Sequence, residues 1–401
     1  MDRDLLRDLE NSFGPRTRER IATAVERVVK AKRSGGKVSV VTGSGPNLHE
    51  GVTTLIAELI RVGVIDGVTT SSAVVGHEMG GTLDRVKRVS GETLGIEQRL
   101  LPHGGHFELT QLEDSSLAEL DSETSLDWEL IHKLQNAPGV EIIKAAGNLG
   151  YPMGLYLERL STEILAIARE TGKPFEEVAG WGADERTMIG AGSRRGIPVI
   201  VTIPQLVGSG RVGLAIGDSL SVTERARRVA GILEESEVII ESGVALAQEI
   251  HDGPFETHTG HGLWAAWDGE PTYSLQGKSL IRIDLDPNLE KVWEAERKGG
   301  EVQGAINQGL PKTKLFDVPF RMEMSGFARL SGSLPIIGDL GAVWPILALK
   351  VADALDLELG FLSYPQDTAR GKAMREWIAD HVAPISRRRM MEQSARAECA
   401  V

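Results

Sequence analysis

A loop rich in histidine and carboxylate side chains holds the densest chemistry of the chain. Between Glu249 and His261 it carries three of the nine histidines and three carboxylates, in a stretch too rich in glycine and proline to form a helix. Imidazoles and carboxylates can transfer protons near neutral pH, and the indole rings that follow can cover a ligand or hold a cation. We therefore predict acid–base or binding roles for Glu249, His251, Asp252, Glu256, His258, His261 and Trp264.

Two alternatives to this acid–base interpretation stay open. In the first, His251, His258 and His261 bind a divalent ion and Glu256 acts as a base, as in a metal-dependent hydrolase or lyase. These histidines lack the four-residue helical spacing of a metal motif, and a single cysteine, Cys399, excludes a cysteine-based zinc cluster, so our prediction is no metal. In the second, the protein is a non-catalytic module that binds a nucleotide or another small molecule, because a fold does not fix a function.

The elements that must position this loop are predicted by β-branched runs that alternate with helical patterns. Helices are expected over 51–62, 155–171 and 222–235. Such alternation predicts an α/β fold with a doubly wound, mostly parallel, Rossmann-like sheet. The six expected strands are Lys37–Thr42, Val64–Thr70, Val140–Ala145, Ile197–Ile203, Glu237–Glu241 and Ser279–Leu285.

The flanking segments differ in pattern from this central region. Residues 1–34 predict a helical arm that is interrupted near Gly14-Pro15, and residues 91–135 show no clear strand and are expected to pack over one edge of the sheet. The pattern gives four parts: the helical arm 1–34, a Rossmann-like NAD-binding and catalytic domain 35–298, a C-terminal addition 299–386 with helices over 343–355 and 368–381, and a frayed tail 387–401.

The composition argues against nucleic acids and anionic membranes as binding partners. With 41% hydrophobic residues and 25% charged residues the chain has the composition of a globular protein, and its formal net charge of −13 offers no field to attract nucleic acid or anionic lipid. The start lacks the basic and apolar segments of a signal peptide, so we expect a cytoplasmic protein without a membrane anchor.

Glycine- and hydroxyl-rich turns follow the expected strands, where ligands bind in an open α/β sheet. Small residues after the first strand let a phosphate approach the backbone, and the hydroxyls after the second suit a ribose or an amide. Ordinary tight turns and helix caps are the alternative, since no G-x-G-x-x-G motif is present. The cofactor-binding candidates are Ser44, Gly45, Asn47, Thr69, Thr70, Ser71, Ser72, Glu78, Gly147 and Asn148.

In order and spacing these turns resemble deoxyhypusine synthase, a family of NAD-dependent enzymes with a Rossmann-like fold. The resemblance rests on the turn with Ser44 and Asn47, on the run 64–70 and on Gly147-Asn148-Leu149-x-x-Pro152, and it covers about residues 37–286. It implies NAD as the cofactor, a homotetramer, and a transferase reaction in which an amine is oxidised to an imine and its alkylamine part passes from an enzyme lysine to a protein lysine.

The resemblance also implies catalytic roles. Gln276-Gly277-Lys278 before a strand is similar to the family's Trp-Gly-Lys, which implies Lys278 as the imine-forming nucleophile and His251, with Glu249 or Asp252, as the proton-transferring group. The family's acidic polyamine pocket is not reproduced here. We therefore expect an NAD-dependent enzyme of deoxyhypusine synthase-like type that acts on another small amine or an amino acid, with a protein lysine as one candidate acceptor.

Overall fold

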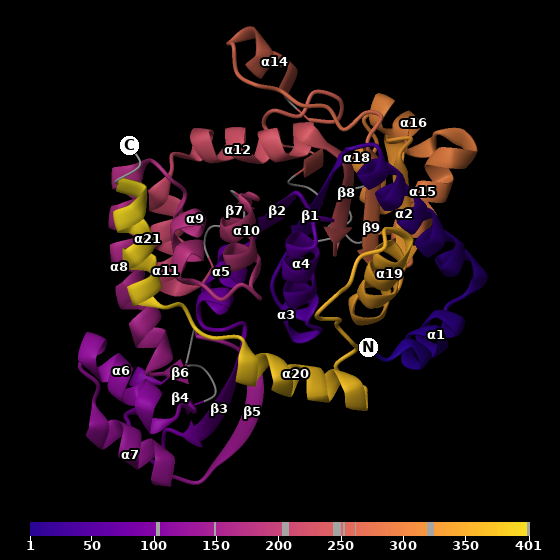
Figure 1. Ribbon diagram of the computed structural model, residues 1–401. Helices are drawn as coiled ribbons and strands as arrows, with labels where there is room; N and C mark the ends of the chain where they lie inside the picture. Colours follow the sequence, from indigo (N-terminus) through magenta and orange to yellow (C-terminus); the bar gives the residue numbers. More distant parts are fainter. Residues whose placement is uncertain are drawn as a thin grey trace.

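The computed structural model shows a large α/β body with a smaller lobe below it (Figure 1). The described residues are 1–101, 105–147, 150–202, 208–243, 250–251, 253–260, 262–318 and 325–398. A sheet of six parallel strands forms the centre of the body, in the order β10-β9-β8-β1-β2-β7. Its strands are β1 (Lys37–Thr42), β2 (Gly67–Thr70), β7 (Val199–Val201), β8 (Ser236–Ser242), β9 (Ser279–Asp284) and β10 (Ser333–Ile337).

The strand order confirms the doubly wound, Rossmann-like prediction. The chain adds β2 and then β7 on one side of β1, crosses back, and adds β8, β9 and β10 on the other side. The direction of winding therefore reverses between β1 and β8. In doubly wound sheets, ligands bind outside the carboxyl ends of the strands at this point.

Both faces of this sheet are buried, which is why its strands consist largely of apolar residues. Val40 and Ile240 point into one apolar cluster, whereas their neighbours Val41 and Ile239 point into the other. Helices of the first cluster include α2 (Pro15–Arg33), α3 (Pro46–His49), α4 (Val52–Arg61), α5 (Ser72–Met79), α8 (Met153–Thr171), α9 (Phe175–Gly182), α10 (Met188–Arg195), α11 (Gly210–Ser219) and α19 (Leu340–Ala354). Helices of the second are α12 (Val222–Glu235), α15 (Asn288–Gly299), α16 (Glu301–Asn307) and α18 (Ser325–Arg329).

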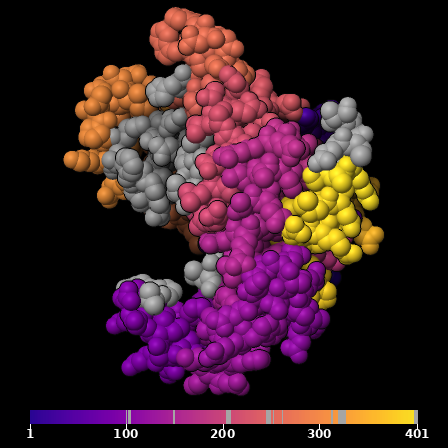
Figure 2. Space-filling model, turned by 90° about the vertical axis from the view of Figure 1, so that its left-hand side faces the viewer, coloured from indigo at the N-terminus to yellow at the C-terminus, as the bar shows by residue number. Residues whose placement is uncertain are grey.

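The lobe is a second, four-stranded sheet in the order β5-β3-β4-β6, visible as a separate bulge in Figure 2. The placement of 140–145 in the parallel sheet was wrong, because this run forms β5, which pairs antiparallel with β3. The prediction that 91–135 contains no clear strand was also wrong, because that segment contains β4. The lobe consists of β3 (Leu83–Ser90), η1 (Gln98–Leu100), β4 (His106–Thr110), α6 (Asp114–Thr124), α7 (Trp128–Asn136), β5 (Gly139–Ala145) and β6 (Gly150–Tyr151).

The C-terminal segment completes the main sheet. It supplies the edge strand β10, and the helices expected over 343–355 and 368–381 are confirmed as α19 and α20 (Ala369–His381). The prediction of a frayed tail is corrected, because residues 387–398 form the helix α21 (Arg387–Glu398), which packs against α9. The fully buried Met390 anchors this otherwise charged helix.

Two further features lie at the ends of the body. The break in the N-terminal helical pattern is confirmed, since α1 (Arg3–Ser12) ends just before α2 begins at Pro15. The short helix α14 (Gly262–Trp267) projects from the top in Figures 1 and 2, and α17 (Lys312–Leu315) lies near α16. Within the described ranges, none of the helices has the length and apolar character that crossing a membrane requires.

Candidate functional site

Two glycines flank the reversal point at the carboxyl edge of the main sheet. Gly45 follows β1 with φ 69° and ψ −117°, and Gly243 follows β8 with φ 109°. A Cβ added to either glycine would meet no atom of the described residues within 4 Å, so among these residues both turns border open space. Backbone of this conformation is readily adopted only by glycine, and it lets a ligand approach the main chain closely. We call the region between these two turns, where doubly wound sheets bind their ligands, the switch-point crevice.

A buried polar cluster joins the two turns. The Asn47 amide Nδ2 donates to the Ser242 carbonyl at 3.2 Å, and the Ser242 hydroxyl donates to Asn47 Oδ1 at 2.5 Å. The indole Nε1 of Trp344, on α19, donates to the Ser242 hydroxyl at 2.8 Å. Asn47, predicted to bind a cofactor, therefore holds the two sides of the crevice in a fixed relation.

Three threonines at the carboxyl ends of neighbouring strands leave buried hydroxyls without a partner among the described residues. They are Thr42 on β1, Thr70 on β2 and Thr202 after β7. Burying a hydroxyl without a hydrogen bond is unfavourable, so such groups fit a site completed by a ligand. Next to them the Ser71 hydroxyl caps α5 by accepting from the Val74 N–H.

A charged triad lies on the other face of the sheet at the same edge. The Glu241 carboxylate on β8 accepts from Arg282 Nε on β9 at 2.5 Å, and its other oxygen lies 3.0 Å from His251 Nε2. Arg282 Nη2 lies 2.7 Å from the same His251 nitrogen. All three side chains are fully buried, and the Arg282 guanidinium stacks on the Phe327 ring.

The triad can hold a proton in two arrangements. A ring nitrogen donates a hydrogen bond when it carries a proton and accepts one when it does not. His251 Nε2 therefore donates to Glu241 in its protonated form and accepts from Arg282 Nη2 in its deprotonated form. His251 Nδ1 has no partner within the described part of the chain. Burial alone would raise the pKa of Glu241, but Arg282 and then His251 outweigh it and lower that pKa to about 2. Glu241 is thus a permanent anion that orients His251.

The rest of the histidine-rich loop is organised by Glu256. Its fully buried carboxylate accepts from the backbone N–H groups of His258, Thr259, Gly260 and Leu275, so it is already occupied. Burial would raise the pKa of Glu256, but the Thr259 hydroxyl, followed by the N–H groups of His258, Thr259 and Leu275, lowers it overall. His258 is exposed, and Trp264 is 63% exposed on the projecting α14, away from the crevice.

The metal-ion alternative at this loop depends on His261, which lies outside the described residues. In the described ranges, no group of three or more histidine, cysteine, aspartate or glutamate side chains could hold a metal ion. Glu249, Asp252 and His261, together with Asn148, lie outside the described residues.

Two cofactor candidates lie away from the crevice opening. The buried Glu78 carboxylate accepts from the N–H groups of Met188 and Ile189 and so caps α10. Gly147 has φ 84° and donates its N–H to Asp84 Oδ2 at 3.0 Å. Burial raises the pKa of both carboxyl groups to about 7, against the opposing effect of these N–H groups and, at Asp84, of Lys144.

These raised pKa values predict that Glu78 and Asp84 contribute less stability as the pH rises. A carboxyl whose folded pKa exceeds its unfolded value stabilises the fold below the unfolded pKa, and this stability is lost as the pH passes about 7. Replacing Glu78 with glutamine should remove about 1.4 kcal/mol of the change in unfolding free energy between roughly pH 6 and 8, as measured by urea unfolding. The exposed control Glu129→Gln should keep the wild-type slope; an equal slope in Glu78→Gln would contradict this assignment.

Lys278 lies at the opposite edge of the sheet. It precedes β9, and its Nζ donates to the carbonyls of Glu234 and Ser236 at 2.7 and 2.8 Å, at the end of α12. Desolvation lowers its pKa. The six residues of β9 place Lys278 about 20 Å from the carboxyl edge. Within one chain, the structure does not bring this lysine to the crevice.

The structure thus brings some of the predicted site residues together and places others elsewhere. It gathers Ser44, Gly45, Asn47, the Thr69–Ser72 segment and His251 at one edge. It adds Glu241 and Arg282, which sequence reasoning missed. Their signal was a charge inside each of two apolar strand runs, and pairing them requires the register in which Glu241 lies opposite Arg282.

Comparison with solved structures gives matches with low TM-scores and low sequence identity. No family model and no curated protein matches the sequence. A conserved putative LOR/SDH protein from Methanococcus maripaludis S2 is 13% identical, with 86% of this chain and 72% of that chain covered and a TM-score of 0.39. AgrE, in a ternary complex with ornithine and NAD+, is 13% identical over 86% of this chain and 34% of its own, with a TM-score of 0.41. ArgZ, a cyanobacterial arginine dihydrolase, is 11% identical over 83% and 32%, with a TM-score of 0.36.

This chain spans about a third of the length of AgrE and of ArgZ. At such identities and TM-scores, we transfer no activity from these proteins to this one. None of these three proteins is described as a deoxyhypusine synthase, and the resemblance to that family stays a prediction.

Proposed function

We propose that the switch-point crevice binds NAD and that the protein is an NAD-dependent enzyme acting on a small amine or an amino acid. The observation that carries this proposal is the pair of open glycine turns, Gly45 and Gly243, on either side of the reversal point. A pyrophosphate needs such a close approach to the main chain. The partnerless hydroxyls of Thr42, Thr70 and Thr202 fit the remaining polar groups of a dinucleotide.

The residues of this chain would then bind, orient and move a proton. When bound, NAD supplies a hydride acceptor. Glu241 orients His251, and its negative charge stabilises the imidazolium that forms when His251 takes a proton from the substrate ammonium. We assign this transfer to His251 Nδ1, the nitrogen that faces neither Glu241 nor Arg282.

The transfer of an alkylamine group is a more specific part of the proposal, and it rests on the resemblance to deoxyhypusine synthase alone. It would pass the alkylamine part of an imine to an acceptor, with a protein lysine as one candidate, and it would use a homotetramer. The position of Lys278 at the amino edge argues against this lysine as the nucleophile for the crevice of its own chain.

Calorimetric titration of NAD tests the cofactor. We expect saturable binding to the wild type and about tenfold weaker binding to Thr70→Val, which removes a hydroxyl from the crevice edge at nearly constant volume. The matched control is Thr53→Val on α4, another buried hydroxyl without a partner in the described ranges, which should leave the affinity unchanged. Absence of saturable binding at millimolar NAD, or equal losses in both variants, would refute the proposal.

A further inference from the structure

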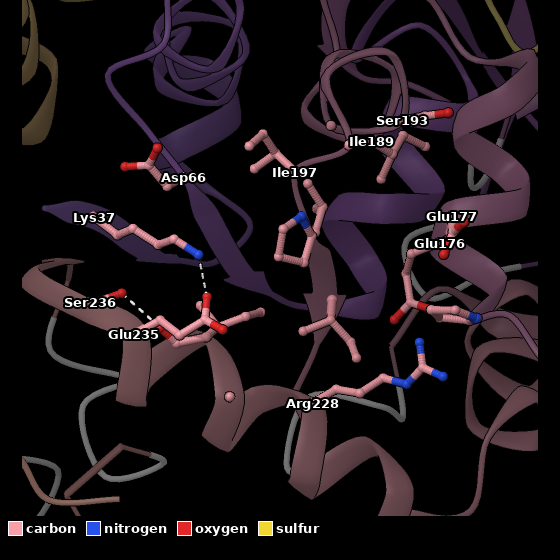
Figure 3. Close-up of a pocket in the computed structure, with 18 of the residues that line it drawn as sticks. Lys37, Asp66, Glu176, Glu177, Ile189, Ser193, Ile197, Arg228, Glu235 and Ser236 are labelled. Carbon is pink, nitrogen blue, oxygen red and sulfur yellow. Dashed lines mark hydrogen bonds and ion pairs between the residues drawn. The ribbon is translucent and has the colours of Figure 1, made fainter. Parts of the chain in front are cut away.

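A second cavity lies at the amino edge of the main sheet, opposite the switch-point crevice. It has a volume of about 500 Å³ and opens where β1, β2, β7 and β8 begin, between α9, α10 and α12. Figure 3 shows Lys37 and Glu235 on one side of this cavity and Glu176 and Arg228 on the other. Nothing in the proposed NAD chemistry uses it.

Its walls are mostly apolar, and its outer charges are already paired. Ile189, Ile197 and Ile232 contribute aliphatic surface, and Trp181 contributes an indole. Among the acidic groups, Asp66 pairs with Lys32, Glu177 with Lys173 and Glu235 with Lys37. Glu176 is the lining carboxylate that none of these three lysines pairs with.

Glu176 is fully buried and has one oxygen without a partner in the described residues. Its Oε1 accepts from the Val201 N–H at 2.8 Å and from Arg225 Nη1 at 2.5 Å, whereas Oε2 accepts from no described residue. Arg225 cannot turn to it freely, because its nitrogens also donate to the carbonyls of Val201 and Ile216. A buried carboxylate oxygen is strongly unfavourable without a donor. A lone water would need two or more polar partners, and the aliphatic walls supply few.

We propose that this cavity is a binding site for a small primary amine with an apolar body. The ammonium would donate to Glu176 Oε2 in a charge-assisted hydrogen bond, and the body would pack against the isoleucines and Trp181. Glu176 pairs with Arg225 through Oε1, which leaves Oε2 as the acceptor for the ligand. Because the two sites lie at opposite edges of the sheet, amine and NAD can be bound together.

Gly231 provides a blocking variant that spares the fold. It lines the cavity from within α12, and a Cβ added there meets no atom of the described residues within 4 Å. Gly231→Met should therefore fill the cavity while replacing a poor helix former. Gly217→Met is the matched control, since Gly217 lies within α11, has equally open space and does not line the cavity.

The test is calorimetric titration of benzylammonium into the full chain, with benzyl alcohol as the uncharged probe. We expect saturable binding of benzylammonium, at least about tenfold weaker binding of benzyl alcohol, and at least a tenfold loss in Gly231→Met but not in Gly217→Met. Glu176→Gln should also weaken binding; should it fail to fold, Gly231→Met still decides. Undiminished binding to Gly231→Met, equal binding of the alcohol, or no binding to the wild type would overturn the proposal. NAD titration of Gly231→Met should match the wild type, which separates this result from the fate of the NAD site.

Discussion

Replacing Arg282 with methionine is expected to lower the free energy of unfolding by about 3–5 kcal/mol. The substitution keeps an apolar side chain of similar length against Phe327 and removes the guanidinium that neutralises Glu241. Glu241 then remains as a fully buried anion, with His251 as its one remaining partner in the described part of the chain. Urea unfolding followed by circular dichroism measures the loss.

Two further variants isolate the buried charge as the cause. The double variant Arg282→Met with Glu241→Gln should recover part of the loss, because it leaves no unpaired carboxylate in the interior. Arg227→Met breaks a partly exposed pair with Glu270 and should cost less than about 1 kcal/mol. A loss in Arg282→Met no larger than in Arg227→Met would show that the triad does not stabilise the fold.

Replacing Gly45 with valine is expected to weaken NAD binding by at least about a hundredfold. The φ and ψ of Gly45 belong to a region that residues with a Cβ avoid, so the turn after β1 must rearrange. A branched side chain would also enter the open space that the pyrophosphate is proposed to occupy. Calorimetric titration measures the affinity, and thermal unfolding measures the cost to the fold.

Gly35→Val is the control for backbone strain at Gly45. Gly35 also has a positive φ, 80°, and it precedes β1 at the amino edge. Its added Cβ likewise meets no described residue within 4 Å. The two variants should lose comparable stability, and only Gly45→Val should lose NAD affinity. Unchanged NAD affinity in Gly45→Val would place the cofactor elsewhere.

Alternating β-branched runs and helical patterns were sufficient to predict the doubly wound sheet, but not which strands belong to it. The β-branched residues of 140–145 specify a strand, yet nothing local says that this strand pairs with β3 in the lobe. Pro335 interrupts the apolar run of β10, which is typical of an edge strand, and β10 is indeed the edge of the main sheet.

The site was predictable where it follows strand ends and not where it depends on register. Ser44, Gly45 and Thr70 follow or end strands, so parallel pairing brings them to one edge. The same rule places Lys278, which precedes its strand, at the other edge. The charges of Glu241 and Arg282 meet only because β8 and β9 align these two residues, and no spacing within the sequence gives that alignment.

The hydrogen bond from Trp344 to Ser242 has a practical consequence for fragments of this protein. It joins residues 102 positions apart and holds the edge of the crevice from α19. A fragment ending near residue 298 would contain every predicted cofactor residue, yet it would lack this tryptophan and would leave β9 as an uncovered strand edge. Such edges recruit other chains and aggregate. Soluble expression of the crevice therefore requires the segment up to α19.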